Sequence, residues 1–170
     1  TKAWIYVQGF NDNVNDSIRL YLVKDTKRFY FDFGHTWDMF CDVSSYENIW
    51  THLTVTWDNT NSNLKIYING ILEQIYTNTH SHGGSGILSN GTTATGNVII
   101  GKNWHSTVTY YFKGELKLLR VYNSIRTQSD IQNAISSGNP NLNNYTTILT
   151  DTNLLYIPMN QDDTKIYYKD

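Results

Sequence analysis

Alternating apolar and polar residues recur along most of this chain. The clearest stretch is 50–58, in which Leu53, Val55 and Trp57 share one side and polar residues share the other. Successive side chains of a β-strand point to opposite faces, so this pattern predicts a strand with one face in a core. Comparable patterns predict strands over 2–9, 18–24, 28–33, 64–69, 71–77, 97–101 and 112–123.

Short polar segments separate these strands and predict turns and loops. Asn69-Gly70 joins two strands, and this dipeptide is preferred in two-residue hairpin turns because both central residues need a positive φ. A turn near Asp25 predicts a second hairpin. The stretch 34–48 has no clear period, so we expect an irregular loop with a short strand, and 77–96 should be mostly surface loop.

One segment has helical spacing. Thr127 can cap a helix with Asp130 three residues on, and an apolar stripe follows at Ile131, Ala134 and Ile135. A glycine and a proline shortly afterwards end the helix. Many short strands with one late helix predict an all-β fold, namely a two-sheet antiparallel jelly-roll sandwich with one short C-terminal helix.

Composition supports this fold class and restricts the partners. Aromatic residues make up 14% of the 170 residues, and aromatic side chains suit the pleated surface of a sheet. The formal net charge is -2, so we expect no nucleic-acid partner. No apolar run approaches the ~20 residues that span a bilayer, so we expect no membrane insertion. The length predicts a single domain over 1–170, and the absence of a leader at Thr1 suggests a mature or excised segment.

An ordered set of short motifs lies between residues 50 and 122. A Trp-x-His strand ending in Trp-Asp precedes a Leu-x-Ile-Tyr-Ile-Asn-Gly hairpin, followed by Ile-Gly, Phe-x-Gly and Arg-Val-Tyr. The residues are Trp50, His52, Trp57, Asp58, Leu64, Tyr67, Asn69, Gly70, Ile100, Gly101, Phe112, Gly114, Arg120, Val121 and Tyr122. With this order and spacing, about 1–135 of the chain resembles the laminin G-like, concanavalin A-like lectin family, which includes the pentraxin type of jelly roll. The resemblance implies that fold, but the same fold carries lectins, adhesion modules, peptide binders and hydrolases.

The C-terminal segment 146–170 is expected to be an extension of this domain. Members of the family usually open with a strand ahead of the one corresponding to 2–9, and 153–160 resembles that opening strand. An unpaired sheet edge is a template for strand addition. The segment 153–160 therefore completes its own sheet, adds to a neighbouring copy in self-assembly, or is a plain terminal strand.

Catalytic chemistry has little support in the sequence. Glycoside hydrolysis needs two carboxyl groups about 5–10 Å apart, yet Glu47, Glu73 and Glu115 are isolated from one another. The single cysteine, Cys41, lacks a supporting signature for nucleophilic catalysis and is expected to be a buried, inert thiol. We therefore expect no enzyme activity and no catalytic residues.

Two loop segments carry aromatic residues beside polar ones. Trp37 adjoins Asp38, and Trp104 adjoins His105 with Tyr110 nearby. An exposed aromatic ring can stack on the apolar face of a sugar while polar neighbours supply hydrogen bonds, so these five residues are candidates for ligand binding. The alternative is that these aromatic rings cap the ends of the sandwich core.

The remaining tryptophans lie on predicted strands. Trp57 shares the face of Leu53 and Val55, whereas Trp4 and Trp50 have the opposite parity from their aliphatic neighbours. We expect all three indoles to pack against the sheets.

No cofactor is required by any motif, but calcium is an option because the family often binds it through loop oxygens. The candidate ligands are Asp12, Asp16, Asp58 and Asn59, which supply the oxygen donors that calcium prefers. An ordinary turn rich in Asp and Asn is the alternative explanation.

These observations favour a non-catalytic recognition module that binds glycan through rim loops. Three Asn-x-Ser/Thr sequons, at Asn15, Asn90 and Asn144, fit an extracellular or cell-surface protein. The alternative function is an adhesive or structural subunit that binds protein, or another copy of itself by strand addition.

Overall fold

A computed structural model of the chain describes ten stretches of it, and they form two compact units, 1–113 and 114–170. Each unit is described by itself. The described residues are 2–8, 18–33, 38–58, 63–77, 98–102, 111–116, 119–122, 124–136, 153–157 and 167–168.

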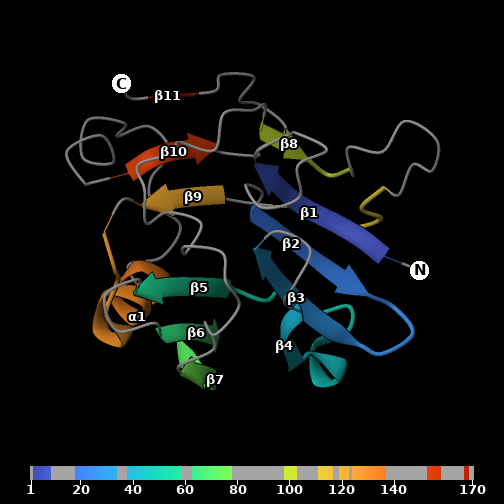
Figure 1. Ribbon diagram of the computed structural model, residues 1–170, viewed down its shortest axis with the longest axis horizontal. Coiled ribbons are helices and arrows are strands. Elements are labelled where there is room, and N and C mark those ends of the chain that lie inside the picture. The colour runs from blue at the N-terminus through green and yellow to red at the C-terminus, as the bar shows by residue number, and fades with distance from the viewer. Residues whose placement is uncertain are drawn as a thin grey trace, which may run out of the picture. The chain divides into compact units, whose positions relative to one another are not determined.

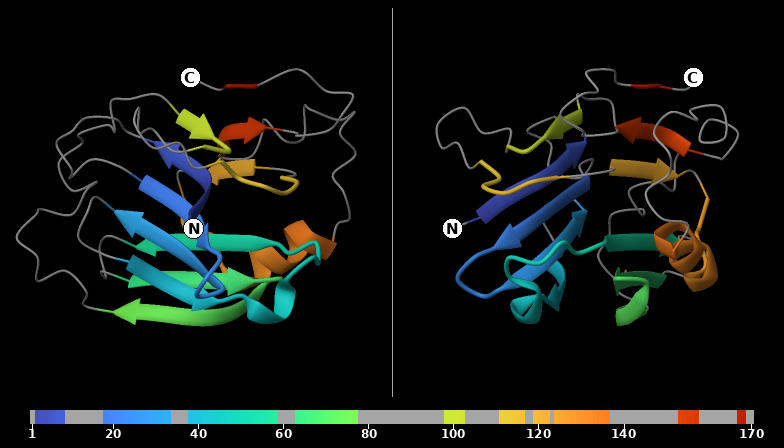
Figure 2. Two further views of the ribbon diagram at one scale, coloured as in Figure 1. Left: turned by 90° about the vertical axis from the view of Figure 1, so that its right-hand side faces the viewer. Right: turned by 180° about the vertical axis from the view of Figure 1, so that it is seen from behind.

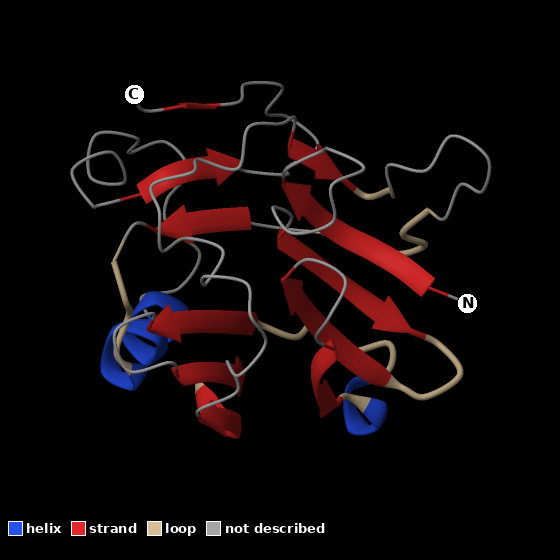
Figure 3. Cartoon of the chain, viewed as in Figure 1, coloured by secondary structure: helices blue, strands red, loops and turns tan. Residues whose placement is uncertain are grey.

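Strands make up most of the described residues (Figure 3). The strands are β1 (Lys2–Gln8), β2 (Ile18–Val23), β3 (Arg28–Phe33), β4 (Asp38–Asp42), β5 (Leu53–Asp58), β6 (Asn63–Ile68), β7 (Ile71–Thr77), β8 (Val98–Ile100), β9 (Leu119–Tyr122), β10 (Asn153–Ile157) and β11 (Tyr167–Tyr168). A short 3-10 helix, η1 (Ser44–Tyr46), follows β4, and the α-helix is α1 (Gln128–Ser136).

Five antiparallel strands of the first unit form sheet A, in the order β4-β3-β2-β1-β8 (Figure 1). The β2–β3 hairpin has the predicted turn, and Lys27 within it has a φ of 52°. The register between β1 and β2 shifts between Trp4 and Tyr6. Beyond β8, the backbone continues the sheet because Lys102 and Tyr111 form an isolated bridge.

Three antiparallel strands form sheet B, in the order β5-β6-β7. The turn from β6 to β7 is the predicted Asn-Gly pair, with φ values of 51° at Asn69 and 77° at Gly70. Both values lie in the left-handed region that such hairpin turns require, so the sequence signal and the backbone agree.

The core of the first unit lies between these two sheets (Figure 2). Its fully buried members come from β3, β4 and β6, and the partly buried ones pack around them from β1, β2, β5 and β7. The buried residues are Phe29, Phe31, Met39, Cys41, Leu64, Ile66 and Ile68. The predicted apolar faces of 18–24, 28–33, 50–58 and 64–69 thus all contribute to one core, and the predicted antiparallel sandwich is confirmed.

The other face of sheet A carries a second, aromatic cluster. Trp4, Tyr21 and Tyr30 are buried, and their rings adjoin in that order at centroid distances of 4.7 and 5.0 Å. Phe40 extends the row, with its ring centroid 5.4 Å from that of Tyr30. The register explains the row, because Trp4 pairs with Tyr21, Tyr21 with Tyr30, and Tyr30 with Phe40. The expectation that Trp4 packs against a sheet is therefore confirmed.

The second unit contains a small sheet and the helix. Its sheet has the order β11-β10-β9, and β10 pairs antiparallel with β9 of the same chain. A C-terminal strand therefore forms over Asn153–Ile157, but it pairs with β9 and β11 rather than with β1, whose two neighbours are β2 and β8. Strand exchange between copies stays a prediction.

The helix begins with the predicted cap. The backbone N–H of Asp130 donates to Thr127 Oγ1 at 3.1 Å, and the backbone N–H of Thr127 donates to Asp130 Oδ2 at 2.9 Å. This reciprocal arrangement is a capping box in which Asp replaces the usual Glu. Ile131, the first residue of the predicted apolar stripe, is buried.

Two sequence expectations are wrong. Of the described residues in the strand expected over 112–123, Leu119–Tyr122 form a strand and 112–116 lie outside any strand. Trp50 does not pack against a sheet: it precedes β5 and its side chain is 63% exposed. The irregular segment 43–52, with η1 inside it, extends to residue 52. Strand β5 therefore begins at Leu53, three residues later than the sequence suggests.

Candidate functional site

Sheet A has two ends, and they carry different predicted loops. One end, which we call the Gln8 end, is formed by Gln8, Ile18 and Phe33, with Asp38 opposite Asp32 on the neighbouring strand. The other, the Lys2 end, is formed by Lys2, Val23, Arg28 and Asp42, which pair across the strands in that order.

The described residues that border the two groups of predicted ligand-binding residues lie at different levels of sheet A. Asp38 pairs with Asp32 at the Gln8 end. The Lys102–Tyr111 bridge follows β8, and Gly101 bonds to Ile5. The structure describes the backbone of Asp38, whereas the other four residues lie outside the described part of the chain. Their roles in binding stay predictions.

Most of the predicted calcium ligands also lie outside the described residues. Of its candidate ligands, Asp12, Asp16 and Asn59 lie outside the described residues, while Asp58 ends β5 and is half-buried. Within the described ranges, no three His, Cys, Asp or Glu side chains come together in a way that could hold a metal ion. Calcium binding therefore stays a prediction.

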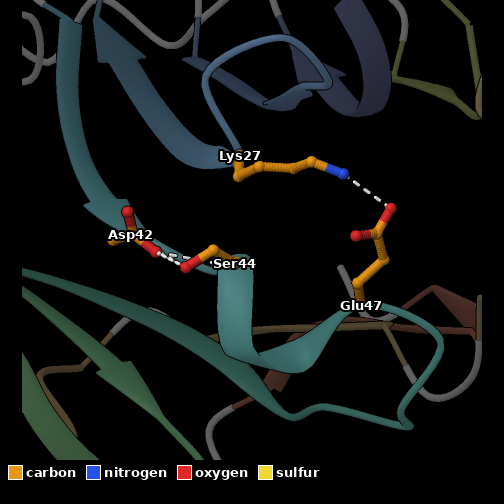
Figure 4. A network of polar contacts seen from close by, with 4 residues as sticks. All are labelled: Lys27, Asp42, Ser44 and Glu47. Atoms are coloured by element: carbon orange, nitrogen blue, oxygen red, sulfur yellow. Dashed lines mark hydrogen bonds and ion pairs between the residues drawn. The ribbon is translucent and has the colours of Figure 1, made fainter.

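A polar network fastens the Lys2 end to the segment that follows β4 (Figure 4). Lys27 Nζ in the β2–β3 turn lies 2.6 Å from Glu47 Oε1, and the Val43 backbone N–H donates to Lys27 O at 2.8 Å. Asp42 accepts hydrogen bonds from the backbone N–H and the hydroxyl of Ser44. The ammonium of Lys27 lowers the pKa of Glu47, and the Ser44 hydrogen bonds lower the pKa of Asp42. The carboxylates of Asp42 and Glu47 therefore both form contacts that stabilise the segment containing η1.

The structure points to a surface that the sequence did not suggest, and we call it the Trp50 surface. It consists of Ile49, Trp50, His52, Asn69 and Ile71, all of them exposed. The apolar members have exposed fractions of 61% for Ile49, 63% for Trp50 and 58% for Ile71. Large apolar side chains exposed side by side along the chain mark a contact surface more often than isolated ones do.

Backbone hydrogen bonds hold this surface in a fixed shape. The Asn69 backbone N–H donates to His52 O at 2.8 Å, and the His52 backbone N–H donates to Asn69 Oδ1 at 2.9 Å. One backbone bond and one bond to the Asn69 side chain thus join the residues next to the last β5–β6 pair, Leu53 and Ile68. The chain leading to Trp50 is thereby fixed beside the β6–β7 turn.

The preceding residues position the indole as well. The Ile49 backbone N–H donates to Tyr46 O at 3.2 Å, which continues η1, and Asn48 has a φ of 62°. The Thr51 hydroxyl donates to Ile49 O at 2.9 Å. Since the turn of chain at Asn48 is anchored on both sides, Trp50 is presented to solvent by an ordered backbone.

The chemistry of the Trp50 surface suits a ligand with an apolar face and hydroxyl groups. The indole offers a flat apolar face, and the exposed His52 ring, whose Nδ1 lies 3.2 Å from Thr54 Oγ1, is a polar group two residues along the chain. Asn69 adds an amide nitrogen as a donor, because its Oδ1 already accepts from His52. The sequence contained one signal for this surface, namely that Trp50 has the opposite parity from the core residues of its segment.

The fold and sequence patterns correspond to a known family. A family profile described as the concanavalin A-like lectin/glucanases superfamily matches residues 1–132. The chain belongs to this superfamily. The suspected laminin G-like, concanavalin A-like resemblance is confirmed, and among curated proteins none matches the chain.

Solved structures show the same fold at low sequence identity. The Ruminococcus gnavus IT-sialidase CBM40 aligns with a TM-score of 0.60 and 18% identity, over 78% of this chain and 73% of that chain. The same module bound to α2,6-sialyllactose aligns with a TM-score of 0.46 and 15% identity, over 65% of this chain and 61% of that chain. An S-layer domain-containing protein from Clostridium thermocellum has a TM-score of 0.40 and 20% identity, over 78% and 62% respectively.

Among the described residues, no helix is long and apolar enough to cross a membrane.

Proposed function

We propose that this domain is a non-catalytic carbohydrate-recognition module of a surface or extracellular protein, and that it binds its ligand at the Trp50 surface. The observation that carries the proposal is the 63% exposure of the Trp50 indole on an ordered backbone. Leaving a large apolar side chain in water forgoes about 1.5–3 kcal/mol of burial free energy. A ligand that stacks on the indole recovers part of it.

The polar neighbours support a sugar ligand over a purely apolar one. His52 and Asn69 are exposed and stand on the strand end next to Trp50, within reach of a ring stacked on the indole. A saccharide presents C–H groups on one face and hydroxyl groups around its edge, which matches an aromatic face bordered by hydrogen-bonding groups. Membership of a lectin-containing superfamily supports the same conclusion.

The proposal that the module is non-catalytic is supported by two carboxyl groups at the Lys2 end, Asp42 and Glu47. A general acid of a glycosidase needs a raised pKa. Glu47 has the opposite property, because the Lys27 ammonium lowers its pKa. Asp42 likewise has a lowered pKa because it accepts two hydrogen bonds from Ser44.

We expect weak binding at a single site. One stacked ring and a few hydrogen bonds give an interface comparable with millimolar affinity, which corresponds to about -4 kcal/mol. Display of several copies raises the effective affinity without any new contact, so the parent protein is expected to present the module in multiple copies on a surface.

The experiment is a glycan array probed with the tetramerised domain, with and without calcium, followed by titration of the best ligand into the monomeric domain. Trp50→Ala is expected to abolish binding, and Trp50→Phe to retain part of it, because the smaller ring still stacks. Ile75→Ala is the control, since Ile75 is an exposed apolar residue of β7 that lies outside the Trp50 surface. Absence of any glycan ligand would overturn the function. Binding that survives Trp50→Ala would overturn the assignment to the Trp50 surface.

The second candidate is adhesion to protein, and the two isoleucines of the Trp50 surface favour it. Ile49, next to Trp50 in the chain, and Ile71, at the start of β7, are both more than half exposed. Tryptophan surrounded by aliphatic side chains is also typical of protein-binding hot spots. This candidate would be favoured if Ile71→Ser abolished binding of a protein partner and left glycan binding unchanged.

A further inference from the structure

Three lysines lie together at the Lys2 end of sheet A. Lys2 opens β1, Lys24 directly follows β2, and Lys102 lies two residues after the end of β8, so they come from three neighbouring strands. All three are exposed. In the described part of the chain, none of their ammonium groups forms an ion pair or a hydrogen bond, and Lys2 lies 4.7 Å from the ring centroid of Tyr21.

The strand register shows that these lysines are near one another. Lys2 pairs with Val23, so Lys24 is one residue beyond the level of Lys2. The Gly101 backbone N–H donates to Ile5 O at 3.1 Å. Because β8 runs antiparallel to β1, Lys102 lies one residue further toward Lys2 than Ile5 does. Neighbouring strands are about 4.8 Å apart, so the three chain positions span roughly 10 Å across the sheet. Lys102 lies near the level of Trp4, which adds about 10 Å along the strands between Lys24 and Lys102.

The other cations of this end are already compensated. Lys27 forms its ion pair with Glu47. Arg28 is the cross-strand neighbour of Asp42, whose pKa its charge helps to lower, and its guanidinium carbon lies 4.0 Å from the Phe40 ring centroid. Asp25, in the β2–β3 turn, offsets one of the three remaining lysines. The Lys2 end therefore keeps a surplus of positive charge although the whole chain carries a formal charge of -2.

An exposed aromatic ring completes this basic surface. Tyr111 is 60% exposed and pairs with Lys102 in the isolated bridge. The Phe112 backbone N–H donates to Gly101 O at 2.8 Å, which holds the segment of Tyr111 against the end of β8. The ring can stack on a sugar beside the ammonium groups.

We propose that the Lys2 end, through Lys2, Lys24, Lys102 and Tyr111, selects an acidic polysaccharide, that is, one with carboxylate groups on its sugar units. This inference rests on the proposed function, which makes the ligand a carbohydrate. It adds that the carbohydrate is negatively charged.

The surplus of positive charge at the Lys2 end is too small to bind nucleic acid or an anionic membrane stably. Stable binding of nucleic acid commonly uses about 6–10 phosphate contacts, and membrane-binding basic clusters contain about 4–8 cations. Three lysines with one nearby carboxylate fall below both ranges. A polysaccharide can add ring stacking on the exposed Tyr111 to these few charge contacts.

The test compares polygalacturonate with its methyl-esterified form, which has the same backbone without the charges. We expect the domain to bind polygalacturonate more tightly and added salt to remove the difference. Lys2→Gln, Lys24→Gln and Lys102→Gln should each reduce the preference about two- to fivefold, the effect of a single exposed charge pair. The combined variant should bind both forms equally. Lys65→Gln, on β6 of sheet B, is the matched control and should retain the full preference.

Other outcomes separate the two proposals. Equal affinity for both polymers in the unaltered domain, or a preference that survives in the combined variant, would overturn the acidic-ligand proposal while leaving glycan recognition intact. Binding of oligothymidylate as tight as that of polygalacturonate would also overturn it, because charge alone would then suffice. Failure to bind any glycan on the array would instead overturn the proposed function.

Discussion

The Tyr76 hydroxyl of β7 bonds both backbone polar groups of Phe40 in β4. It accepts from the Phe40 N–H at 2.9 Å and donates to the Phe40 carbonyl oxygen at 2.8 Å. These groups belong to the outer edge of sheet A, since β4 pairs only with β3 within the described ranges. One side chain of sheet B thus occupies backbone groups at which another strand could otherwise pair.

Replacement of this hydroxyl is expected to destabilise the first unit. Tyr76→Phe leaves a partly buried N–H and a carbonyl without their partner, which costs about 1–3 kcal/mol. The ring itself still packs against the core. Urea denaturation monitored by tryptophan fluorescence should therefore show a lower midpoint with an unchanged slope.

Tyr46 provides the matched control for that measurement. It is a half-buried tyrosine that packs against the same core, and its hydroxyl forms no hydrogen bond with any described residue. Tyr46→Phe should change the free energy of unfolding by less than about 0.5 kcal/mol. Equal effects of the two substitutions would contradict the role assigned to the Tyr76 hydroxyl.

The buried ion pair of sheet A gives a second prediction. Arg19 and Asp32 pair directly across β2 and β3, and their side chains are 4% and 8% exposed. Removing one charge leaves the other buried, so Asp32→Ala is expected to cost about 3–5 kcal/mol. The double variant Arg19→Met/Asp32→Leu should be more stable than Asp32→Ala. Additive effects of the separate Arg19→Met and Asp32→Leu changes in a double-mutant cycle would rule out their coupling.

The thiol of Cys41 is expected to be unreactive in the folded domain. Burial in the core raises its pKa to about 11, and the negative charges of Glu73 and Asp42 add to this effect. At pH 8 about a thousandth of the thiol is then ionised, and the thiolate is the reactive form. Ellman's reagent should react slowly with the native domain and rapidly in denaturant. Fast labelling of the native domain would contradict this placement of Cys41.

The sequence predicted the core of the sandwich well, because one periodicity determines both the strand and its buried face. Ile18, Leu20 and Leu22 pack against the core as their alternation suggested, and so do Val55 and Trp57. The Asn69-Gly70 turn is equally local, since it needs only two residues with positive φ. These features depend on neighbours in sequence.

The second buried face of sheet A was not predicted. Alternation assigns Tyr21 and Tyr30 to the side opposite the core, which would ordinarily face water in an antiparallel sheet. The structure buries both rings in a row with Trp4, and it buries Arg19 against Asp32 nearby. The signal was available, because large aromatic residues recur at the supposedly polar positions of three strands.

The binding surfaces were the least predictable part because they depend on which strand ends come together. The sequence shows that Trp50 alternates out of phase with the core residues of its segment. The proximity of this segment to Asn69, however, follows from the β5–β6 register. The grouping of Lys2 with Lys102 likewise follows from pairing between β1 and β8, whose residues are nearly a hundred positions apart. Such long-range pairing has no local signature.

The capping box of α1 makes the helix sensitive to acid. The hydrogen bonds from the Thr127 hydroxyl and backbone N–H lower the pKa of Asp130 below its ordinary value of about 4. A carboxyl group with a lowered pKa contributes stability that is present above its unfolded-state pKa and is lost as the pH falls through its folded-state pKa. The helix should therefore lose this contribution below about pH 4. Nuclear magnetic resonance titration of the Asp130 carboxyl carbon should give a pKa below that of Thr127→Ala, in which the hydroxyl is missing. Identical titration curves for the two proteins would show that the Thr127 hydroxyl does not stabilise the charged form.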